Sequence, residues 1–361
     1  MCKANLMATI LLAGAVCASA ETILVHAHRG GRAARPENTL ASFEYGIEQG
    51  ADVLELDLAV TKDNVLVVSH SPYLTQPVSG DPRMAAAVAN ERRCDGPPVP
   101  PGTLIHSLTL AELKQYDCGA HTLPAFPHQV AVPHTPIPTF DEVLDLAPMG
   151  TFQFNVETKI FPNRPEITPT PEEFVAMIDK AVKKRNLESR VILQSFDFRT
   201  LRAMKALDPQ IRLSALFGKA QYDGFMGITD PDKSFAHIAK ITGADILSPD
   251  ASLVTLEEVK TAHDLGLQVA PYTANTEAEW KRLEDAHVDA IITDDPAGLL
   301  AWLRAQKRCC IRRVKDSFSR PGPKRSCQDA APTGNSAVSL VERTRGCHEH
   351  VRSSNEVNAG V

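Results

Sequence analysis

Short runs of continuously apolar, often β-branched residues recur along the chain, and segments with helix-like spacing separate them. Each run stays apolar until its last residues, which is typical of a strand buried on both faces of a parallel sheet. Eight such strands alternating with helices predict an α/β fold of the (β/α)8 TIM-barrel class. The predicted strands are ILVHAH (23–28), VLELDL (53–58), FNVETK (154–159), VILQSF (191–196), IRLSALF (211–217), ADILSP (244–249), LQVAPYT (267–273) and DAIITD (289–294).

One further apolar run, residues 65–70, follows the second predicted strand after the turn-forming sequence Lys62-Asp63-Asn64 and predicts a hairpin arm. Residues from about 72 to 138 are rich in Pro, Gly and His and contain one convincing helix, near 108–115, capped by Ser107 or Thr109. We expect this stretch to be an insertion over one mouth of the barrel. Loops of that length in compact domains are usually functional or mobile.

The first residues have the order of parts found in a secretory signal. Lys3 precedes the apolar stretch 6–16, and the small residues Ala18-Ser19-Ala20 follow it. This predicts a signal peptide at 1–20, export to the periplasm or beyond, and a barrel domain at 21–305. A membrane anchor is the alternative, but the apolar stretch is shorter than the roughly 20 residues that a spanning helix needs. Lipid attachment at Cys17 is disfavoured by the bulky Val16.

Residues 306–361 form a basic, Ser/Arg-rich tail with almost no periodicity, which predicts disorder. Basic runs can bind nucleic acid or anionic lipid, but composition favours a solvated tail. The whole chain has a formal net charge of −6 and a pI near 6.1, so it has no global basic field. We expect no nucleic-acid partner and no stable membrane insertion, and the oligomeric state stays open.

Two of the cysteines lie where the oxidising compartment of an exported protein would permit a disulfide. Cys2 and Cys17 leave with the signal peptide, and Cys94 and Cys118 lie in one loop-rich segment of an exported protein. These conditions favour a disulfide between Cys94 and Cys118. Zinc is the competing interpretation, but neither cysteine has a C-x-x-C partner or a histidine pair at finger-like spacing.

Polar side chains follow the apolar part of six predicted strands, at the end where barrels of this class have their active sites. Any one of them can be a satisfied structural group. Six at one mouth are hard to explain structurally, because buried charge is costly unless it is paired or bound to a metal. They are His28 and Arg29, Glu55 and Asp57, Glu157 and Lys159, Gln194 and Ser195, Thr273 and Asn275, and Asp294.

Three of these residues are carboxylates with spacing suited to one site. Glu55 and Asp57 are two apart on a strand and therefore face the same side, and Glu157 faces inward if its strand alternates in the same register. Three clustered carboxylates repel one another, which a hard cation such as Ca²⁺ or Mg²⁺ relieves. The alternative is pairing with Arg29 and Lys159. Zinc is disfavoured because the cluster has no sulfur.

The same mouth carries groups suited to phosphate chemistry. Arg29 and Lys159 supply the fixed positive charge that a phosphate oxyanion requires. His28 and His70 are candidates for general acid–base catalysis because their side chains titrate near neutral pH. A lone histidine is more often structural, but two at one mouth favour a catalytic pair.

The stretch HAHRGGRAARPENTLASFEYGIEQGADVLELDLAVTKDNVLVVSH (26–70) carries HRG, PENT, E-x-D and a final histidine in that order. The segments NVETK, LQSF, APYTAN and DAIITDDP follow at later strand ends. In this order the motifs resemble those of glycerophosphodiester phosphodiesterases over about residues 23–303. Each motif alone is weak, and their combination is specific.

The resemblance implies a role for each matching residue. His28 and His70 would be the acid–base pair, Glu55, Asp57 and Glu157 the ligands of one divalent cation, Ca²⁺ or Mg²⁺, and Arg29 and Lys159 the phosphate-binding residues. Supporting or pocket positions would be Glu37, Asn38, Gln194, Tyr272 and Asp294. Two departures concern Ser71-Pro72, where the family commonly has Asp or Asn after the histidine, and PYT in place of an aromatic WT.

The reaction implied by the resemblance is hydrolysis of a small-molecule glycerophosphodiester to sn-glycerol 3-phosphate and an alcohol. A lysophospholipase D-type lipid phosphodiesterase is the nearest alternative, and it would need an apolar channel. The insertion offers Leu104, Leu123, Phe126 and Val130 for that purpose but little aromatic density. A non-catalytic binding barrel is the third possibility, although pure binding needs no second histidine.

Overall fold

The computed structural model describes residues 22–76, 91–162, 164–218, 232 and 234–306. The predicted signal peptide at 1–20 lies outside these ranges, and so do residues 77–90 of the predicted insertion. The predicted tail lies outside them as well, except for its first residue. Residue 306 lies in a helix that is described from residue 296 onward.

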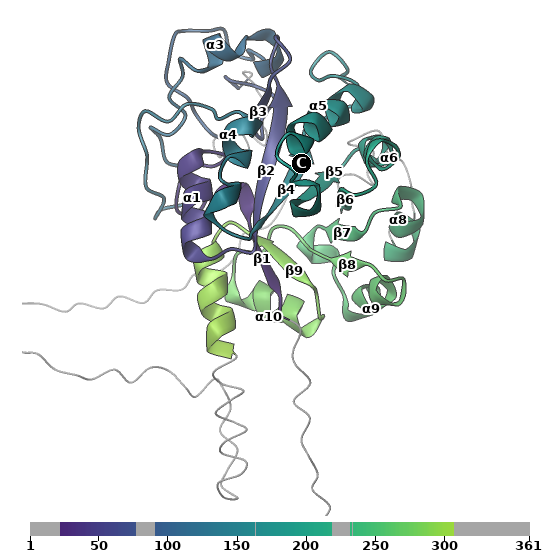
Figure 1. Cartoon of the computed structure of the whole chain (residues 1–361). Coiled ribbons are helices and arrows are strands. Elements are labelled where there is room, and N and C mark those ends of the chain that lie inside the picture. The colour runs from purple at the N-terminus through teal and green to yellow at the C-terminus, as the bar shows by residue number, and fades with distance from the viewer. Residues whose placement is uncertain (1–21, 77–90, 163, 219–231, 233, 307–361) are drawn as a thin grey trace, which may run out of the picture. The chain divides into compact units, whose positions relative to one another are not determined.

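All eight predicted strands are present and form one parallel sheet (Figure 1). The ladders run in the order β8-β7-β6-β5-β4-β2-β1-β9, so strands that are consecutive along the chain are neighbours in space. Their bounds are β1 Leu24–Ala27, β2 Val53–Val60, β4 Gln153–Thr158, β5 Val191–Ser195, β6 Arg212–Phe217, β7 Ile246–Pro249, β8 Gln268–Val269 and β9 Ala290–Thr293. Parallel pairing places the carboxyl ends of all eight strands at one edge.

Strand β8 is much shorter than the predicted run 267–273. Pro271 has no N–H to donate, which limits a regular ladder at this point. Single backbone hydrogen bonds continue the pairing: Ala270 N donates to Leu247 O (2.8 Å), and Ile292 N donates to Pro271 O (3.0 Å). Asp289 N also donates to Val269 O (3.0 Å), so β8 and β9 meet and the eight-stranded barrel is nearly closed.

Helices surround the barrel, as the βα alternation predicts (Figure 1). Most begin at a threonine or serine whose side chain accepts a hydrogen bond from a backbone N–H of the first turn, which satisfies a donor that the helix cannot satisfy itself. No helix within the described ranges is long and apolar enough to cross a membrane. The helices are α1 Leu40–Gln49, α4 Phe140–Leu144, α5 Pro171–Lys183, α6 Phe198–Leu207, α8 Phe235–Thr242, α9 Leu256–Asp264 and α10 Glu277–Asp285.

Strand β2 shows how the fold separates core from site. All eight of its residues are buried. Leu54, Leu56 and Leu58 belong to the main apolar core, which also includes side chains of the surrounding helices. Because successive side chains alternate between faces, Glu55 and Asp57 point to the opposite side, into the barrel. Glu55 and Asp57 are therefore buried inside the barrel, whereas the leucines that alternate with them pack in the apolar core outside it.

The insertion has its own small core beside the hairpin arm β3 (Leu66–Val68), which pairs antiparallel with β2 as predicted. A second apolar cluster joins Val67 of this arm to insertion residues such as Ile105, Leu113 and Tyr116. The predicted helix near 108–115 is shorter, α3 Leu110–Leu113, because Leu108 is extended and the Thr109 capping box starts the helix at Leu110. The predicted disulfide between Cys94 and Cys118 is present.

Candidate active site

Several residues of the loop after β1 have a positive φ, and two of them begin its first turn. Arg29 (φ 50°) and Gly30 (φ 87°) turn the chain sharply at the barrel mouth. A Cβ on Gly30 would lie 2.7 Å from the carbonyl carbon of Ser42 and 2.8 Å from the backbone nitrogen of Phe43, so only glycine fits against the start of α1. The turn aims the backbone N–H of Arg29 at Glu55 Oε2, 2.9 Å away.

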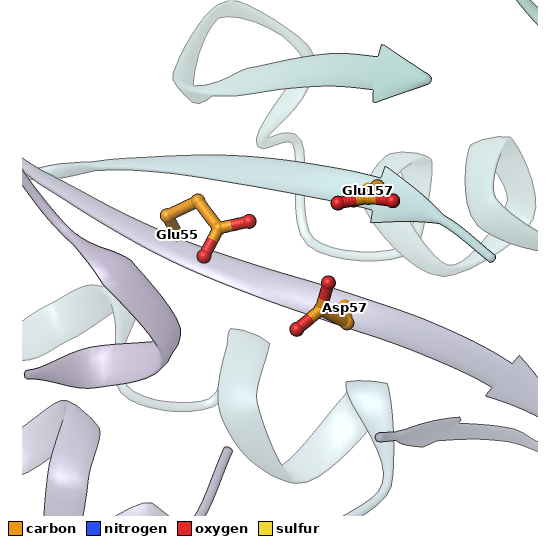
Figure 2. A group of neighbouring side chains, drawn as sticks. All are labelled: Glu55, Asp57 and Glu157. Carbon is orange, nitrogen blue, oxygen red and sulfur yellow. The ribbon is translucent and has the colours of Figure 1, made fainter. Parts of the chain in front are cut away.

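Three carboxylates meet inside this mouth (Figure 2). Glu55 and Asp57 come from β2, and Glu157 comes from the adjacent strand β4, where it is the register partner of Asp57. One oxygen of each lies within 4.8 Å of an oxygen of the other two, and all three residues are buried. The same-face spacing and the parallel register thus bring the predicted ligand set together.

Amide side chains hold two of these carboxylates in place. Gln194 Nε2 donates to Glu55 Oε1 (2.7 Å), and Asn155 Nδ2 donates in turn to Gln194 Oε1 (2.8 Å). Asn38 of the PENT motif donates from Nδ2 to Asp57 Oδ2 (2.8 Å). Asn155 was not predicted, although its position two residues before Glu157 on one strand gives it the same facing and offered a signal.

Two cations contact the cluster, so the pairing considered from the sequence is also realised. Lys159 Nζ donates to Glu157 Oε1 (2.5 Å) and lies 2.9 Å from Asp57 Oδ1, and Arg29 Nε lies 3.3 Å from Asp57 Oδ2. Arg29 is shared with Glu37, whose two oxygens accept from its NH1 at 3.0 and 3.1 Å. Asp57 Oδ1 accepts no hydrogen bond from the described residues, although it forms the ion pair with Lys159.

The electrostatics show that these cations do not fully compensate the cluster. Burial, together with the charges of Asp57 and Glu157, raises the pKa of Glu55 well above its usual value. Burial raises the pKa of Glu157 to about 7, although Lys159 opposes the shift. Burial also acts on Asp57, but Lys159 and Arg29 outweigh it and hold its pKa well below the usual range. Three buried oxygen donors with excess negative charge fit a hard divalent cation.

His28 lies at the edge of the cluster with a carboxylate behind it. Its Nδ1 is 2.5 Å from Asp294 Oδ1, and its Nε2 is 3.9 Å from Glu55 Oε2. Burial lowers the pKa of His28, and the charge of Asp294 opposes only part of this shift. Despite burial, the interaction with His28 lowers the pKa of Asp294 to about 2. Around neutral pH the pair therefore combines a neutral imidazole with an ionised carboxylate.

His70 lies after the hairpin arm, and a residue of the insertion contacts it. The carboxylate oxygens of Glu91 are 3.4 and 3.5 Å from His70 Nδ1. Burial, and then the charges of Arg29 and Lys159, lower the pKa of His70 to about 4. Glu91 and its neighbour Arg92 were not predicted, because the Pro- and Gly-rich insertion has no periodicity that would indicate which way a side chain faces.

The remaining predicted positions divide into two groups. Glu37 contacts Arg29 and also Arg32, whose NH2 lies 2.8 Å from Glu37 Oε2, so it orients the basic residues of the first loop. Tyr272 follows β8 and packs its ring edge-on against Phe196, with 5.7 Å between ring centroids. Its hydroxyl donates to the Phe217 carbonyl (3.3 Å), which fixes the ring beside the ends of β5 and β6.

Comparisons with known proteins connect the chain to one family. The sequence pattern of the glycerophosphoryl diester phosphodiesterase family matches residues 28–298. A glycerophosphodiester phosphodiesterase from Caldanaerobacter subterraneus subsp. tengcongensis is 31% identical over 281 residues, covering 78% of this chain and 98% of the relative. One from Bacillus subtilis is 30% identical over 284 residues, covering 77% and 85%. A crystal structure from Silicibacter pomeroyi has a TM-score of 0.68 at 27% identity and covers 79% of this chain and 94% of that one.

Proposed function

The chain belongs to the glycerophosphoryl diester phosphodiesterase family, and we propose that it hydrolyses glycerophosphodiesters to sn-glycerol 3-phosphate and an alcohol with one bound divalent cation. The observation that carries the proposal is the meeting of three buried carboxylates, two cations and two carboxylate-backed histidines at one barrel mouth. A structural role explains the individual ion pairs. A structural role does not explain why two histidines lie beside a buried cluster of carboxylates whose negative charge is only partly neutralised.

Glu55, Asp57 and Glu157 would hold the cation, which we propose to be Ca²⁺ or Mg²⁺ because all three donors are oxygens. When bound, the cation supplies charge neutralisation at the phosphate and polarises an oxygen of the substrate. Asp57 Oδ1, which accepts no hydrogen bond within the described residues, is the ligand atom most in need of such a partner. Gln194 and Asn38 keep the carboxylates oriented through the hydrogen bonds described above.

Arg29 and Lys159 would bind the phosphate group of the substrate. Both are buried and fixed by carboxylates, so they add positive charge at defined places without the entropy cost of ordering exposed side chains. Each side chain has several N–H groups, and those that do not bond to the carboxylates can donate to a phosphate oxygen. The positive φ of Arg29 keeps the loop close to β2 while its guanidinium reaches toward the cluster.

The two histidines would move the protons. In the proposed first step, a hydroxyl of the glycerol moiety transfers its proton to Nε2 of one histidine while its oxygen bonds to phosphorus. The bond from phosphorus to the leaving oxygen breaks, and the other histidine gives a proton to that oxygen. Because both histidine pKa values lie below neutral in the free protein, this histidine would take up its proton from solvent when the substrate binds, since the negative phosphate favours the protonated imidazole. Water then opens the cyclic phosphate with the roles reversed. Carboxylates on both Nδ1 atoms leave Nε2 as the reacting nitrogen.

The assay that tests the proposal measures release of choline and sn-glycerol 3-phosphate from glycerophosphocholine. We expect turnover to disappear in excess chelator and to return with Ca²⁺ or Mg²⁺. Full turnover by protein shown to be free of metal would refute the cation dependence. A parallel assay with lysophosphatidylcholine tests the lipid alternative, and faster turnover of this lipid would replace the proposed substrate class.

We also propose that the protein is exported. The N-terminal signal-like segment and the Cys94–Cys118 disulfide support this, since disulfides persist in oxidising compartments. N-terminal sequencing of protein recovered outside the cytoplasm should give Glu21 as the first residue. An intact Met1 in that protein would contradict cleavage.

A further inference from the structure

His70 takes its carboxylate from an unusual place in the chain. The residues that directly follow it, Ser71 and Pro72, carry neither a carboxylate nor an amide side chain. Glu91, 21 positions later in the sequence, places both carboxylate oxygens 3.4–3.5 Å from His70 Nδ1. The contact crosses from the end of the hairpin arm to the insertion.

We infer that Glu91 is a positioning residue for His70, so that the insertion completes the active site rather than merely covering it. The inference rests on the proposed function, in which His70 moves a proton through Nε2. A carboxylate that accepts the Nδ1 proton fixes the tautomer with a lone pair on Nε2 and restricts rotation of the ring. Glu91 thus does for His70 what Asp294 does for His28.

The neighbour of Glu91 ties the same segment to both catalytic loops. Arg92 NH2 donates to the hydroxyl of Ser69, which directly precedes His70 (3.0 Å). Arg92 NH1 donates to the carbonyl oxygen of Glu37 (3.3 Å), and at 3.5 Å to that of Asn38. These bonds fix the backbone of residue 92 relative to the PENT loop and to His70. Glu91 therefore reaches the imidazole from an anchored position and not from a free loop.

The other side of the segment is anchored by a covalent bond and a backbone pair. Cys94, three residues after Glu91, is bonded to Cys118, which is buried in the apolar cluster of the insertion. Asp95 and Asp117 exchange two backbone hydrogen bonds, with N–O distances of 2.8 and 2.7 Å. The rigidity that a positioning carboxylate needs is thus supplied by the core of the insertion.

The experiment compares variants of the metal-loaded full-length protein in glycerophosphocholine hydrolysis. Glu91→Ala should lower kcat roughly tenfold and leave KM and metal content within about twofold, because a misoriented base affects the chemical step and not binding. Glu91→Gln keeps an acceptor oxygen and should recover most of that loss. Asp95→Asn is the matched control: it removes an exposed carboxylate of the same segment that contacts His121, and it should leave kcat unchanged.

A double-variant cycle separates positioning from general support of the fold. In a His70→Ala background, Glu91→Ala should have no further effect on kcat, because its target is gone. Additive losses would mean that Glu91 acts through something other than His70 and would overturn the inference. Normal kcat in Glu91→Ala would overturn it as well.

A spectroscopic experiment tests whether Glu91 positions His70 even if the proposed substrate is wrong. Nitrogen NMR of the imidazoles, with His70 assigned by its loss in His70→Ala, should show a proton on Nδ1 in the unsubstituted protein and a mixture of tautomers in Glu91→Ala. An unchanged tautomer would refute the role of Glu91. Absence of turnover in the unsubstituted protein, with the tautomer shift present, would refute the proposed function and leave the positioning role intact.

Discussion

Each of the two histidines at the barrel mouth pairs with a carboxylate, and we call these pairs the His28 corner (His28 and Asp294) and the His70 corner (His70 and Glu91). The two corners combine the same chemical groups but are built from different parts of the fold. At the His28 corner, the carboxylate partner Asp294 comes from the end of β9, next to β1 in the barrel, and it lies 2.5 Å from Nδ1. At the His70 corner, Glu91 comes from the insertion and lies about 1 Å farther from Nδ1. The side chain of His28 is 13% exposed and that of His70 is 29% exposed.

The difference concerns how each partner is held. Asp294 is fixed by Asn275, whose Nδ2 donates to Asp294 Oδ2 (2.8 Å) and whose Oδ1 accepts from the Asp294 backbone N–H (2.9 Å). Among the residues that the structure describes, no amide side chain donates to the Glu91 carboxylate, whose position depends instead on its neighbours Arg92 and Cys94. Barrel strands therefore build a tight corner from local geometry, whereas the insertion builds a looser one that can vary without disturbing the barrel.

The largest effect should come from the carboxylate cluster inside the barrel mouth. Glu55→Gln should lower kcat on the order of 10³-fold and weaken metal binding, because it removes a charged ligand and leaves both histidines in place. Kinetics and metal titration of the purified variant measure this. Without metal, its melting temperature should equal or exceed that of the unsubstituted protein, because burial beside Asp57 and Glu157 makes ionised Glu55 costly. A variant that binds metal normally would contradict the ligand role.

The histidines themselves should give the next largest losses. His28→Ala and His70→Ala should each lower kcat by roughly 10²-fold or more while metal content and fold remain, since each removes a proton carrier. The double variant should be scarcely worse than the poorer single variant, because the two groups act as a unit. Steady-state kinetics with metal analysis provides the check. Near-normal kcat in either variant would remove that histidine from the mechanism.

The contrast between the corners also explains what the sequence could predict. Glu55 and Asp57 follow from strand periodicity alone, and His28, Asp294 and Gln194 follow from their places at strand ends. Regular strands fix the direction of each side chain, so spacing is enough. The proposed phosphate-binding role of Arg29 and Lys159 depends on the family resemblance in addition, because a cation beside carboxylates is equally compatible with simple ion pairing.

Glu91 could not be predicted for a physical reason. Its position depends on the Cys94–Cys118 disulfide and on hydrogen bonds from Arg92, which join residues far apart in the sequence. No repeating pattern encodes such contacts. The shortness of β8 is a milder case, since Pro271 was visible in the sequence, but its effect on the ladder depends on which strands flank it.

A direct comparison of the partners should separate the corners. Asp294→Ala should lower kcat roughly 10²-fold, against roughly tenfold for Glu91→Ala. The reason is that Asp294 lies closer to its histidine and is held by two hydrogen bonds from Asn275, so it restricts the His28 ring more strongly. Both variants should keep KM and metal content. Parallel kcat measurements under saturating substrate test the order. Equal losses would show that the corners are functionally equivalent despite their different construction.

The smallest effect should come from the disulfide, which acts on one corner only. Replacing Cys94 and Cys118 together by Ser should lower kcat about threefold, because Glu91 loses an anchor three residues away while Arg92 still holds the segment. The change should also lower the free energy of unfolding of the insertion by about 2–4 kcal/mol, the usual cost of losing a native disulfide. In a Glu91→Ala background the same replacement should leave kcat unchanged, since the carboxylate it would displace is absent. Thermal unfolding monitored together with kcat separates the two effects. An equal loss of kcat in both backgrounds would mean that the disulfide supports the barrel mouth as a whole, and the division into two separately built corners would then be wrong.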